Sequence, residues 1–268
     1  MSRTTTPFDQ LLAHLETDLG FESSHYNDAY LERRIAARMR RVDTDEYETY
    51  TERLRTDPEE RKALLDSLSI NVTGFFRNPA VWEELRTVLR AISENPGPTR
   101  VWSAPCADGR EPYSLAMLAL DDPEISSRKF EVLATDISEP ALDVARAGVY
   151  SASRTRDIEG ELSLLSEYEP YLEREENRFT VRDRVKEHVR FERHDLLRDE
   201  PKSGIDLALC RNLLIYINTA YKAAVVDTVL DSLSPDGYLA IGKTETVPRA
   251  CADRLSAVDN RLRIYRLE

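Results

Sequence analysis

The chain has few of the residues that mark metal, redox or membrane proteins. Three cysteines (Cys106, Cys210 and Cys251) and four histidines are scattered over 268 residues, without the spacing of zinc sites, disulfide frameworks or catalytic triads. No apolar run approaches the roughly 20 residues that cross a bilayer, and the N-terminus lacks a hydrophobic signal core. We therefore expect a globular cytoplasmic protein with no metal site and no membrane insertion.

Lysine is also scarce. Six of the 37 basic residues are lysines, whereas aspartate and glutamate total 49, which gives a net charge of −12. This acidic balance argues against general nucleic-acid binding. A lysine-poor, acid-rich surface is typical of proteins from salt-loving microbes, and an ordinary acidic protein is the alternative.

Only nine glycines are present, and one of them stands in the most informative turn. Residues 101–116 (Val-Trp-Ser-Ala-Pro-Cys-Ala-Asp-Gly-Arg-Glu-Pro-Tyr-Ser-Leu-Ala) predict a short strand, a turn from Pro105 to Gly109 and a helix. Leu133-Ala-Thr-Asp136 predicts a second buried strand that ends on a carboxylate. This is the first half of a nucleotide-binding α/β sheet, in which the acid accepts ribose hydroxyls. Because a G-x-G-x-x-G phosphate cradle is missing, the pattern favours a nucleoside without phosphates, such as S-adenosylmethionine.

Helical periodicity dominates the first third of the chain, and strands alternate with helices after it, which is typical of a mostly parallel, doubly wound sheet. The expected helices lie near residues 8–19, 30–39, 47–54, 58–68, 79–93, 111–120, 139–147 and 219–233, and the expected strands near 100–104, 130–135, 189–193, 205–210, 238–242 and 261–266. The Asn95-Pro-Gly-Pro98 linker divides an all-helical N-terminal domain (residues 1–94) from an α/β domain (95–268). We expect a small β insertion at residues 150–187.

Four sequence blocks occur in order along the chain. They are Asn71-Val-Thr-Gly-Phe-Phe-Arg-Asn-Pro79, the turn block at residues 102–114, Leu133-Ala-Thr-Asp-Ile137 and Cys210-Arg-Asn-Leu-Leu-Ile-Tyr216. Together they resemble the CheR family of chemotaxis-receptor glutamate O-methyltransferases, and the resemblance extends to Gly242-Lys-Thr-Glu245. It implies a Rossmann-like, S-adenosylmethionine-dependent methyltransferase fold, with S-adenosyl-L-homocysteine as product. The acceptors would be glutamates in the cytoplasmic helical region of methyl-accepting chemotaxis receptors, and we expect a monomer.

The resemblance also implies site residues by motif position. Glu111 would face the methionine part of the cofactor and Asp136 its ribose. Arg77 and Tyr216 would lie nearest the transferred methyl group, and they are the expected catalytic residues. The other expected cofactor contacts are Asn71, Thr73 and again Arg77 over the cofactor, Asp195 and Leu196 beside the adenine, and Arg211 and Asn212 at the pocket floor.

Each of these assignments has a plainer alternative. Asp136 can cap the following helix, Glu111 can complement a positive helix N-terminus, and Arg77 can form a structural ion pair. The Arg211-Asn212 pair can be a turn that caps a helix, and Tyr216 lies among apolar neighbours that are typical of a core. The preceding strand and turn favour ribose binding by Asp136, and the cofactor contact is also favoured for Glu111. The family pattern favours the site for Arg77, for Arg211-Asn212 and for Tyr216.

Two positions depart from that pattern. Pro105 stands where the family usually has glycine, and it removes a backbone donor. Arg110 stands where an acidic residue is usual: facing solvent it would be harmless, and facing the sulfonium it would weaken binding. These departures motivate the alternative of a catalytically weak receptor-binding sensor. Residues 171–182 lack the glycine of the hairpin tip that docks a receptor tether in some members, so we expect no dependence on such a tether.

Arginines gather on one face of the second expected helix, opposite Ile35 and Met39. They are Arg33, Arg34, Arg38 and Arg41. On an acidic chain this face indicates a docking surface for an acidic receptor helix bundle, and the resemblance implies the same use. The alternative is a solvated face whose charges pair with nearby acidic residues.

Overall fold

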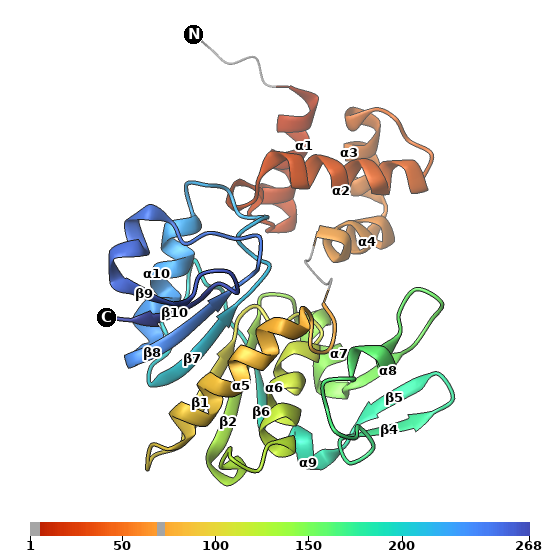
Figure 1. Ribbon diagram of the computed structural model, residues 1–268. Coiled ribbons are helices and arrows are strands. Elements are labelled where there is room, and N and C mark those ends of the chain that lie inside the picture. Colours follow the sequence, from red (N-terminus) through yellow and green to blue (C-terminus); the bar gives the residue numbers. More distant parts are fainter. Residues whose placement is uncertain (1–5, 69–72) are drawn as a thin grey trace. The chain divides into compact units, whose positions relative to one another are not determined.

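The computed structural model describes residues 6–68 and 73–268, and the contacts among them separate two units (Figure 1). The first unit takes in Met1–Ile70 and a later segment, Leu214–Lys222, and the second takes in Asn71–Leu213 and Ala223–Glu268. The division therefore falls near residue 70 and not at residue 94, where the linker composition placed it. The first unit is built from two separate stretches of chain.

Within its described residues the first unit holds four α-helices, and the sequence predicted all of them. They are α1 (Pro7–Leu19), α2 (Asp28–Arg41), α3 (Tyr47–Thr56) and α4 (Pro58–Leu68). Helix α1 begins at a capping box formed by Thr6 and Asp9, and it ends at Gly20, whose φ of 65° suits glycine. The apolar faces of the four helices meet in one core, which includes Leu11, Leu15, Leu31, Ile35, Leu54 and Leu64. No helix in the described part of the chain is long and apolar enough to span a membrane.

A seven-stranded sheet forms the centre of the second unit. Its strands are β1 (Thr99–Ser103), β2 (Phe130–Asp136), β6 (Val189–Arg193), β7 (Ile205–Cys210), β8 (Leu233–Ile241), β9 (Leu255–Asp259) and β10 (Ile264–Leu267). They lie in the order β6-β2-β1-β7-β8-β10-β9. Strands β6, β2, β1, β7 and β8 pair in parallel, and β10 runs antiparallel to both of its neighbours. This is the mostly parallel, doubly wound sheet that the sequence predicted, with β9 as an additional edge strand.

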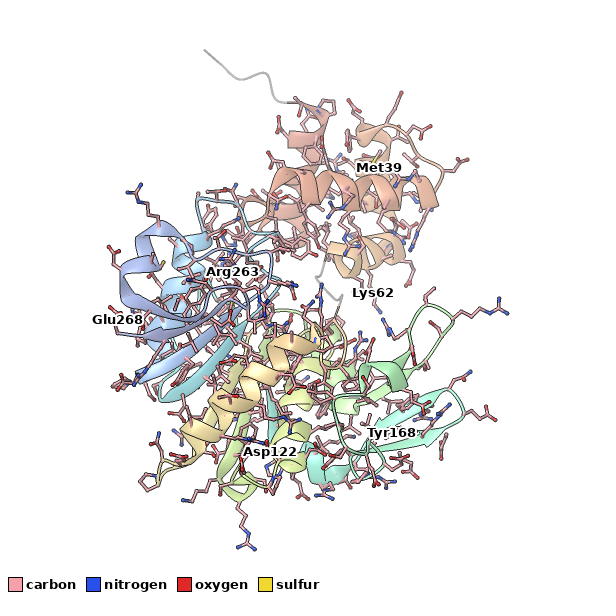
Figure 2. All side chains as sticks on the ribbon, viewed as in Figure 1. Met39, Lys62, Asp122, Tyr168, Arg263 and Glu268 are labelled. Carbon is pink, nitrogen blue, oxygen red and sulfur yellow. The ribbon has the colours of Figure 1, made fainter. Side chains whose placement is uncertain are left out.

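Helix α5 (Pro79–Ser93) packs on this sheet together with α6 (Arg110–Asp121), as Figure 1 shows. It buries Trp82, Leu85 and Leu89 in the same apolar cluster as the sheet. Asp122, labelled in Figure 2, lies just beyond α6. It accepts hydrogen bonds from Arg90 Nε at 2.9 Å and from Arg86 Nη1 at 3.2 Å. This burial and ion pairing explain why α5 belongs to the second unit and not to the N-terminal helices.

The predicted insertion is a three-stranded antiparallel sheet. Its strands β3 (Val149–Ser151), β5 (Arg178–Val181) and β4 (Leu172–Glu175) lie in the order β3-β5-β4. Phe179 and Val181 on β5 belong to the main core of the second unit, so the insertion is packed against that core. The other helices of the second unit include α7 (Glu139–Ala147), α8 (Ile158–Glu161), α9 (Asp183–Lys186) and α10 (Lys222–Ser232).

Candidate functional site

The carboxyl ends of three neighbouring strands bring the main expected site residues to one edge of the sheet. Strand β1 lies between β2 and β7. Asp136 ends β2, Arg211 directly follows β7, and Glu111 lies in the first turn of α6, the helix after β1. In open α/β sheets, ligands bind at the carboxyl edge of the strands. The structure therefore places Glu111, Asp136 and Arg211 where such a ligand is expected.

Glu111 and Arg211 form a buried ion pair at this edge. Arg211 Nη1 donates to Glu111 Oε2 over 3.0 Å, and Ser103 Oγ donates to Glu111 Oε1 over 2.9 Å. Burial raises the pKa of the Glu111 carboxyl group, and the charges of Arg211 and Arg77 oppose that rise. Arg211 Nε is buried without a hydrogen-bond partner among the described residues. An unpaired buried donor is costly, so this atom favours a ligand oxygen nearby.

Asp136 keeps both carboxylate oxygens engaged with backbone. Its Oδ2 accepts from the N–H of Ala107 over 2.8 Å, and its Oδ1 accepts from the N–H of Ser138 over 2.9 Å. Burial raises the pKa of the Asp136 carboxyl group, and these backbone donors oppose the rise. The N-cap of α7 is Ser138, not Asp136. Each carboxylate oxygen retains further acceptor capacity, which a ribose hydroxyl can use.

The turn between β1 and α6 fixes Asp136 in place. The N–H of Cys106 donates to the carbonyl of Thr135 over 2.8 Å, next to the bond from Ala107 to Asp136. Gly109 has a φ of 88°, and a Cβ there would lie 2.7 Å from the Cβ of Ala145 on α7. The single glycine of the turn is therefore required by its backbone conformation and by helix packing.

Arg110 is fully buried, which excludes the solvent-facing alternative for this residue. Its Nη2 and Nε donate to the carboxylate of Asp108 over 2.9 and 3.1 Å, and its Nη1 lies 3.9 Å from Oε2 of Glu161. The guanidinium also lies over the ring of Tyr150, at 5.8 Å. Two carboxylates therefore balance the unusual positive charge at this position.

The segment that carries Thr73 and Arg77 is held by its backbone. The carbonyl of Arg77 accepts from Arg211 Nη2 over 2.9 Å and from Trp82 Nε1 over 3.0 Å. The N–H of Phe75 donates to Oε2 of Glu161 over 2.9 Å. Residues 73–79, with Gly160 and Glu161, line a cavity of about 310 Å³. Asn71, the remaining residue expected here, lies outside the described residues.

Glu161 and Glu245 hold backbone groups around the candidate site, and the sequence patterns predicted a role for neither of them. Glu161 comes from α8 in the insertion and contacts both the residue 73–77 segment and Arg110. Oε2 of Glu245 accepts from the N–H of Asn212 over 2.8 Å and from the N–H of Gly242 over 2.6 Å. Asn212 has a φ of 61°, and Glu245 fixes it in this conformation. For Glu245, the signal in the sequence was its place in the Gly242-Lys-Thr-Glu245 block of the family resemblance.

Asp195 and Leu196 follow β6, the strand next to β2. Residue pairing sets Arg193 on β6 beside Asp136 on β2, so the two strand ends are neighbours. Asp195 Oδ1 accepts from the N–H of Leu197 over 2.9 Å, which fixes the turn that carries Leu196. The structure thus brings these two residues to the same edge of the sheet as Asp136.

Comparison with known proteins decides the family. Residues 71–263 match "CheR methyltransferase, SAM binding domain", and residues 6–69 match "CheR methyltransferase, all-alpha domain". The chain belongs to the CheR methyltransferase family. It is a methyltransferase of the S-adenosylmethionine-dependent fold, and the division between the two matches agrees with the division between the two units.

Three curated relatives of this CheR chain illustrate its similarity to known proteins. The "Chemotaxis protein methyltransferase" of Listeria monocytogenes is 31% identical over 248 residues, which is 92% of each chain. The "Chemotaxis protein methyltransferase 2" of Vibrio cholerae is 28% identical and covers 87% of this chain and 82% of its own. The "Probable biofilm formation methyltransferase WspC" of Pseudomonas aeruginosa is 31% identical and covers 86% of this chain and 55% of its own.

Tyr216 of this CheR chain belongs to the first unit, whereas Arg77 belongs to the second. The ring of Tyr216 packs against the ring of Tyr30 on α2, with centroids 4.8 Å apart. Tyr216 is only partly buried against the core of the N-terminal helices. Tyr216 therefore packs against an aromatic ring, which agrees with its apolar sequence neighbours, but its side chain is only partly buried.

The arginine face of α2 is only partly available for docking. Arg38 lies in a buried ion pair with Glu60 of α4, with Nη2 2.5 Å from Oε2 and Nε 3.1 Å from Oε1. It therefore stabilises the first unit and is not the exposed docking residue that we expected. Arg33 and Arg41 are exposed, and Arg34 is half-buried with its guanidinium 5.6 Å from the centroid of the Tyr30 ring.

The three cysteines are buried and free. Burial raises the pKa of the Cys106 and Cys210 thiols well above the usual range, which keeps them protonated. Within residues 6–68 and 73–268, no group of three or more His, Cys, Asp or Glu side chains is arranged to hold a metal ion.

Proposed function

We propose that this CheR protein transfers the methyl group of S-adenosylmethionine to glutamate side chains of methyl-accepting chemotaxis receptors in the cytoplasm. The product would be a glutamyl methyl ester, as in chemotactic adaptation. The buried Glu111–Arg211 pair beside Asp136 is the observation that carries the proposal, because the chain belongs to the CheR family and these residues occupy the ligand edge of its sheet. The names of the Listeria and Vibrio relatives support the choice of chemotaxis proteins as substrates.

The chemistry of the edge fits the cofactor. The amino-acid part of S-adenosylmethionine carries an ammonium and a carboxylate, and the ribose carries two hydroxyls. Glu111 offers a buried carboxylate, Arg211 Nε offers an unpartnered buried donor, and Asp136 offers acceptor oxygens. We propose the remaining expected residues as further cofactor contacts: Asn71, Thr73, Arg77, Asp195, Leu196 and Asn212.

Methyl transfer to a glutamate needs little proton chemistry from the protein. The cofactor supplies an electrophilic methyl group on sulfur, and a glutamate with a reference pKa of about 4.3 is already ionised at neutral pH. The protein must align the acceptor and limit its hydration. We propose that Arg77, whose carbonyl is fixed by Arg211 and Trp82, orients the acceptor carboxylate. The hydroxyl group of Tyr216 would donate a hydrogen bond to the acceptor carboxylate or orient the methyl group.

The test is transfer of labelled methyl groups from S-adenosylmethionine to purified cytoplasmic fragments of chemotaxis receptors. We expect label on the receptor that mild base releases, because carboxyl methyl esters are base-labile. A receptor fragment in which the labelled glutamates are replaced by glutamine is the matched control, and it should stay unlabelled. Label on nucleic acid or small molecules instead would contradict the proposal. Intact receptor binding without calorimetric binding of S-adenosylhomocysteine would support the sensor alternative.

A further inference from the structure

The chain on either side of Tyr216 is hydrogen-bonded to the residues that lead into α2. The N–H of Asn27 donates to the carbonyl of Tyr216 over 2.9 Å, and the N–H of Asn218 donates to the carbonyl of His25, also over 2.9 Å. Tyr26 and Ile217 form an antiparallel bridge between these two bonds. This short ladder explains why the Leu214–Lys222 segment belongs to the first unit.

Asn27 lies at the junction of this ladder and α2. Its side-chain Oδ1 accepts from the N–H of Tyr30 over 2.8 Å, which caps the helix. Its Nδ2 donates in the other direction, to the carbonyl of Ile215 over 2.8 Å. A carboxamide carries both a donor and an acceptor, so one side chain can serve both elements. With its backbone N–H, Asn27 thus holds the two consecutive carbonyls of Ile215 and Tyr216.

The ring of Tyr216 is held by the same helix turn. It packs against Tyr30, the residue whose N–H Asn27 accepts, at a tilt of 53°. The hydroxyl of Tyr30 donates in turn to the carbonyl of Leu68 at the end of α4, over 2.9 Å. Both the backbone and the ring of Tyr216 therefore take their position from the start of α2.

We infer that Asn27 is a positioning residue, whose carboxamide sets the place of Tyr216 relative to α2, the helix that carries the exposed arginines Arg33 and Arg41. The inference rests on the proposed role of Tyr216 in methyl transfer. Asn27 itself acts through the backbone of residues 215 and 216. A receptor bound by α2 would consequently meet a Tyr216 that is already fixed to the same helix.

The test is Asn27→Asp, which should keep one of the two hydrogen bonds of the side chain and remove the other. Aspartate caps helices as well as asparagine does, so the bond from the N–H of Tyr30 should survive. The donor to Ile215 is lost, and a carboxylate oxygen faces its carbonyl. Asn27→Ser, which also caps helices but has no amide group, is the second variant. The matched control is Asp57→Asn, the reverse exchange at the residue whose carboxylate accepts the N–H groups of Glu59 and Glu60 at the start of α4.

We expect kcat for receptor methylation to fall about tenfold in both Asn27 variants, the equivalent of one lost hydrogen bond. The KM for S-adenosylmethionine should stay within about twofold, because Asn27 and its hydrogen-bond partners Tyr30, Ile215 and Tyr216 belong to the first unit, whereas Glu111, Asp136 and Arg211 belong to the second. Amide hydrogen exchange at residues 215–218 should become faster, while α2 keeps its protection. The Asp57→Asn control should match the wild type in all three measurements.

Two results would overturn the inference in an active enzyme. One is an unchanged exchange rate at residues 215–218, because Asn27 would then not hold the segment. The other is faster exchange with wild-type kcat, because the position of Tyr216 would then not matter for turnover. If the wild-type chain itself methylates no receptor, the proposed function fails and the catalytic part of this inference fails with it. Exchange, which needs no activity, separates these cases.

Discussion

Arg211 donates to Glu111 over 3.0 Å, although the two residues lie 100 positions apart in the chain. Glu111 begins the helix after β1, and Arg211 follows β7, so the pair joins two neighbouring strand ends. Arg211 also donates to the carbonyl of Arg77. One guanidinium therefore links the carboxyl edge of the sheet to the segment that leads into α5.

We expect Arg211→Met to destabilise the second unit by about 3–5 kcal/mol, because it leaves the buried Glu111 carboxylate unpaired. The double variant Glu111→Gln/Arg211→Met should lose less stability than the two single losses added together. Chemical denaturation of the four proteins measures this coupling. Strictly additive losses would mean that Glu111 and Arg211 contribute to the free energy of unfolding independently of each other.

Gly74→Ala should weaken binding of S-adenosylhomocysteine. A Cβ at residue 74 would lie 3.2 Å from Oε1 of Glu161, so the Glu161 carboxylate would have to shift. Because that carboxylate accepts the N–H of Phe75, the segment carrying Arg77 would shift with it. We expect roughly a threefold to tenfold loss of affinity in calorimetry, about the effect of one weakened hydrogen bond.

The control for this substitution is Gly97→Ala, where an added Cβ meets nothing within 4 Å. It should bind S-adenosylhomocysteine as the wild type does. Gly74→Ala should also cost less affinity in a Glu161→Ala background, since the clashing carboxylate is gone. An equal cost in both backgrounds would assign the effect to something other than Glu161.

Charge reversal of Arg33 and Arg41 to glutamate should raise the KM for the receptor by about tenfold at low salt. Both side chains are exposed, so stability and cofactor affinity should change little. The difference from the wild type should shrink as salt screens the exposed charges. Steady-state methylation at two salt concentrations checks this, and an unchanged KM would leave the arginine face without a docking role.

Arg38→Glu should behave differently from those two reversals. It would place a second carboxylate against Glu60, which is buried and also accepts from the hydroxyl of Tyr50 over 2.6 Å. The expected result is loss of folding of the first unit, with a thermal midpoint well below that of the Arg33/Arg41 variant. Wild-type stability together with weaker receptor binding would contradict this prediction and would show that Arg38 takes part in receptor docking.

The first unit should lose stability in acid because of Glu60. Burial alone would raise the pKa of Glu60, but hydrogen bonds from Arg38 and Tyr50 outweigh it and hold the pKa below the usual 4.5. The unfolded state therefore binds the proton more readily, so the stabilisation is complete above about pH 4.5 and decreases as the pH falls through the lower pKa of the folded state. Thermal melts from pH 7 to pH 3 should show this decrease. Glu60→Gln should flatten the decrease at the cost of lower stability at pH 7.

Local patterns predicted most of the fold. Helices α1 to α5 carry apolar stripes, and the central strands are continuous apolar runs, so their positions follow from the sequence. The edge strands β9 and β4 were harder to predict, because no residue of Leu255–Asp259 is fully buried and Leu172–Glu175 is mostly charged. The domain boundary was misplaced for another reason. The linker composition is visible locally, but the burial of α5 against the sheet is not.

The position of a residue at the sheet edge was predictable where a strand end or a motif marks it, as at Glu111, Asp136 and Arg211. It was not predictable where one residue supports another from a distant part of the chain. Glu245, Glu161 and Asn27 bind backbone groups that lie 33, 86 and 188 positions away in the chain, respectively. Periodicity grouped Arg38 with the exposed arginines of α2, but it could not show that Arg38 forms a buried ion pair with Glu60 of α4.

The Leu214–Lys222 segment has a consequence for recombination between relatives. It is encoded within the methyltransferase half of the chain, yet its hydrogen-bond partners are residues 25–27. A chimera that exchanges only the N-terminal helices would pair this segment with foreign neighbours. Functional chimeras should therefore carry residues 214–222 along with the helices, and changes on the two sides of this ladder should be inherited together.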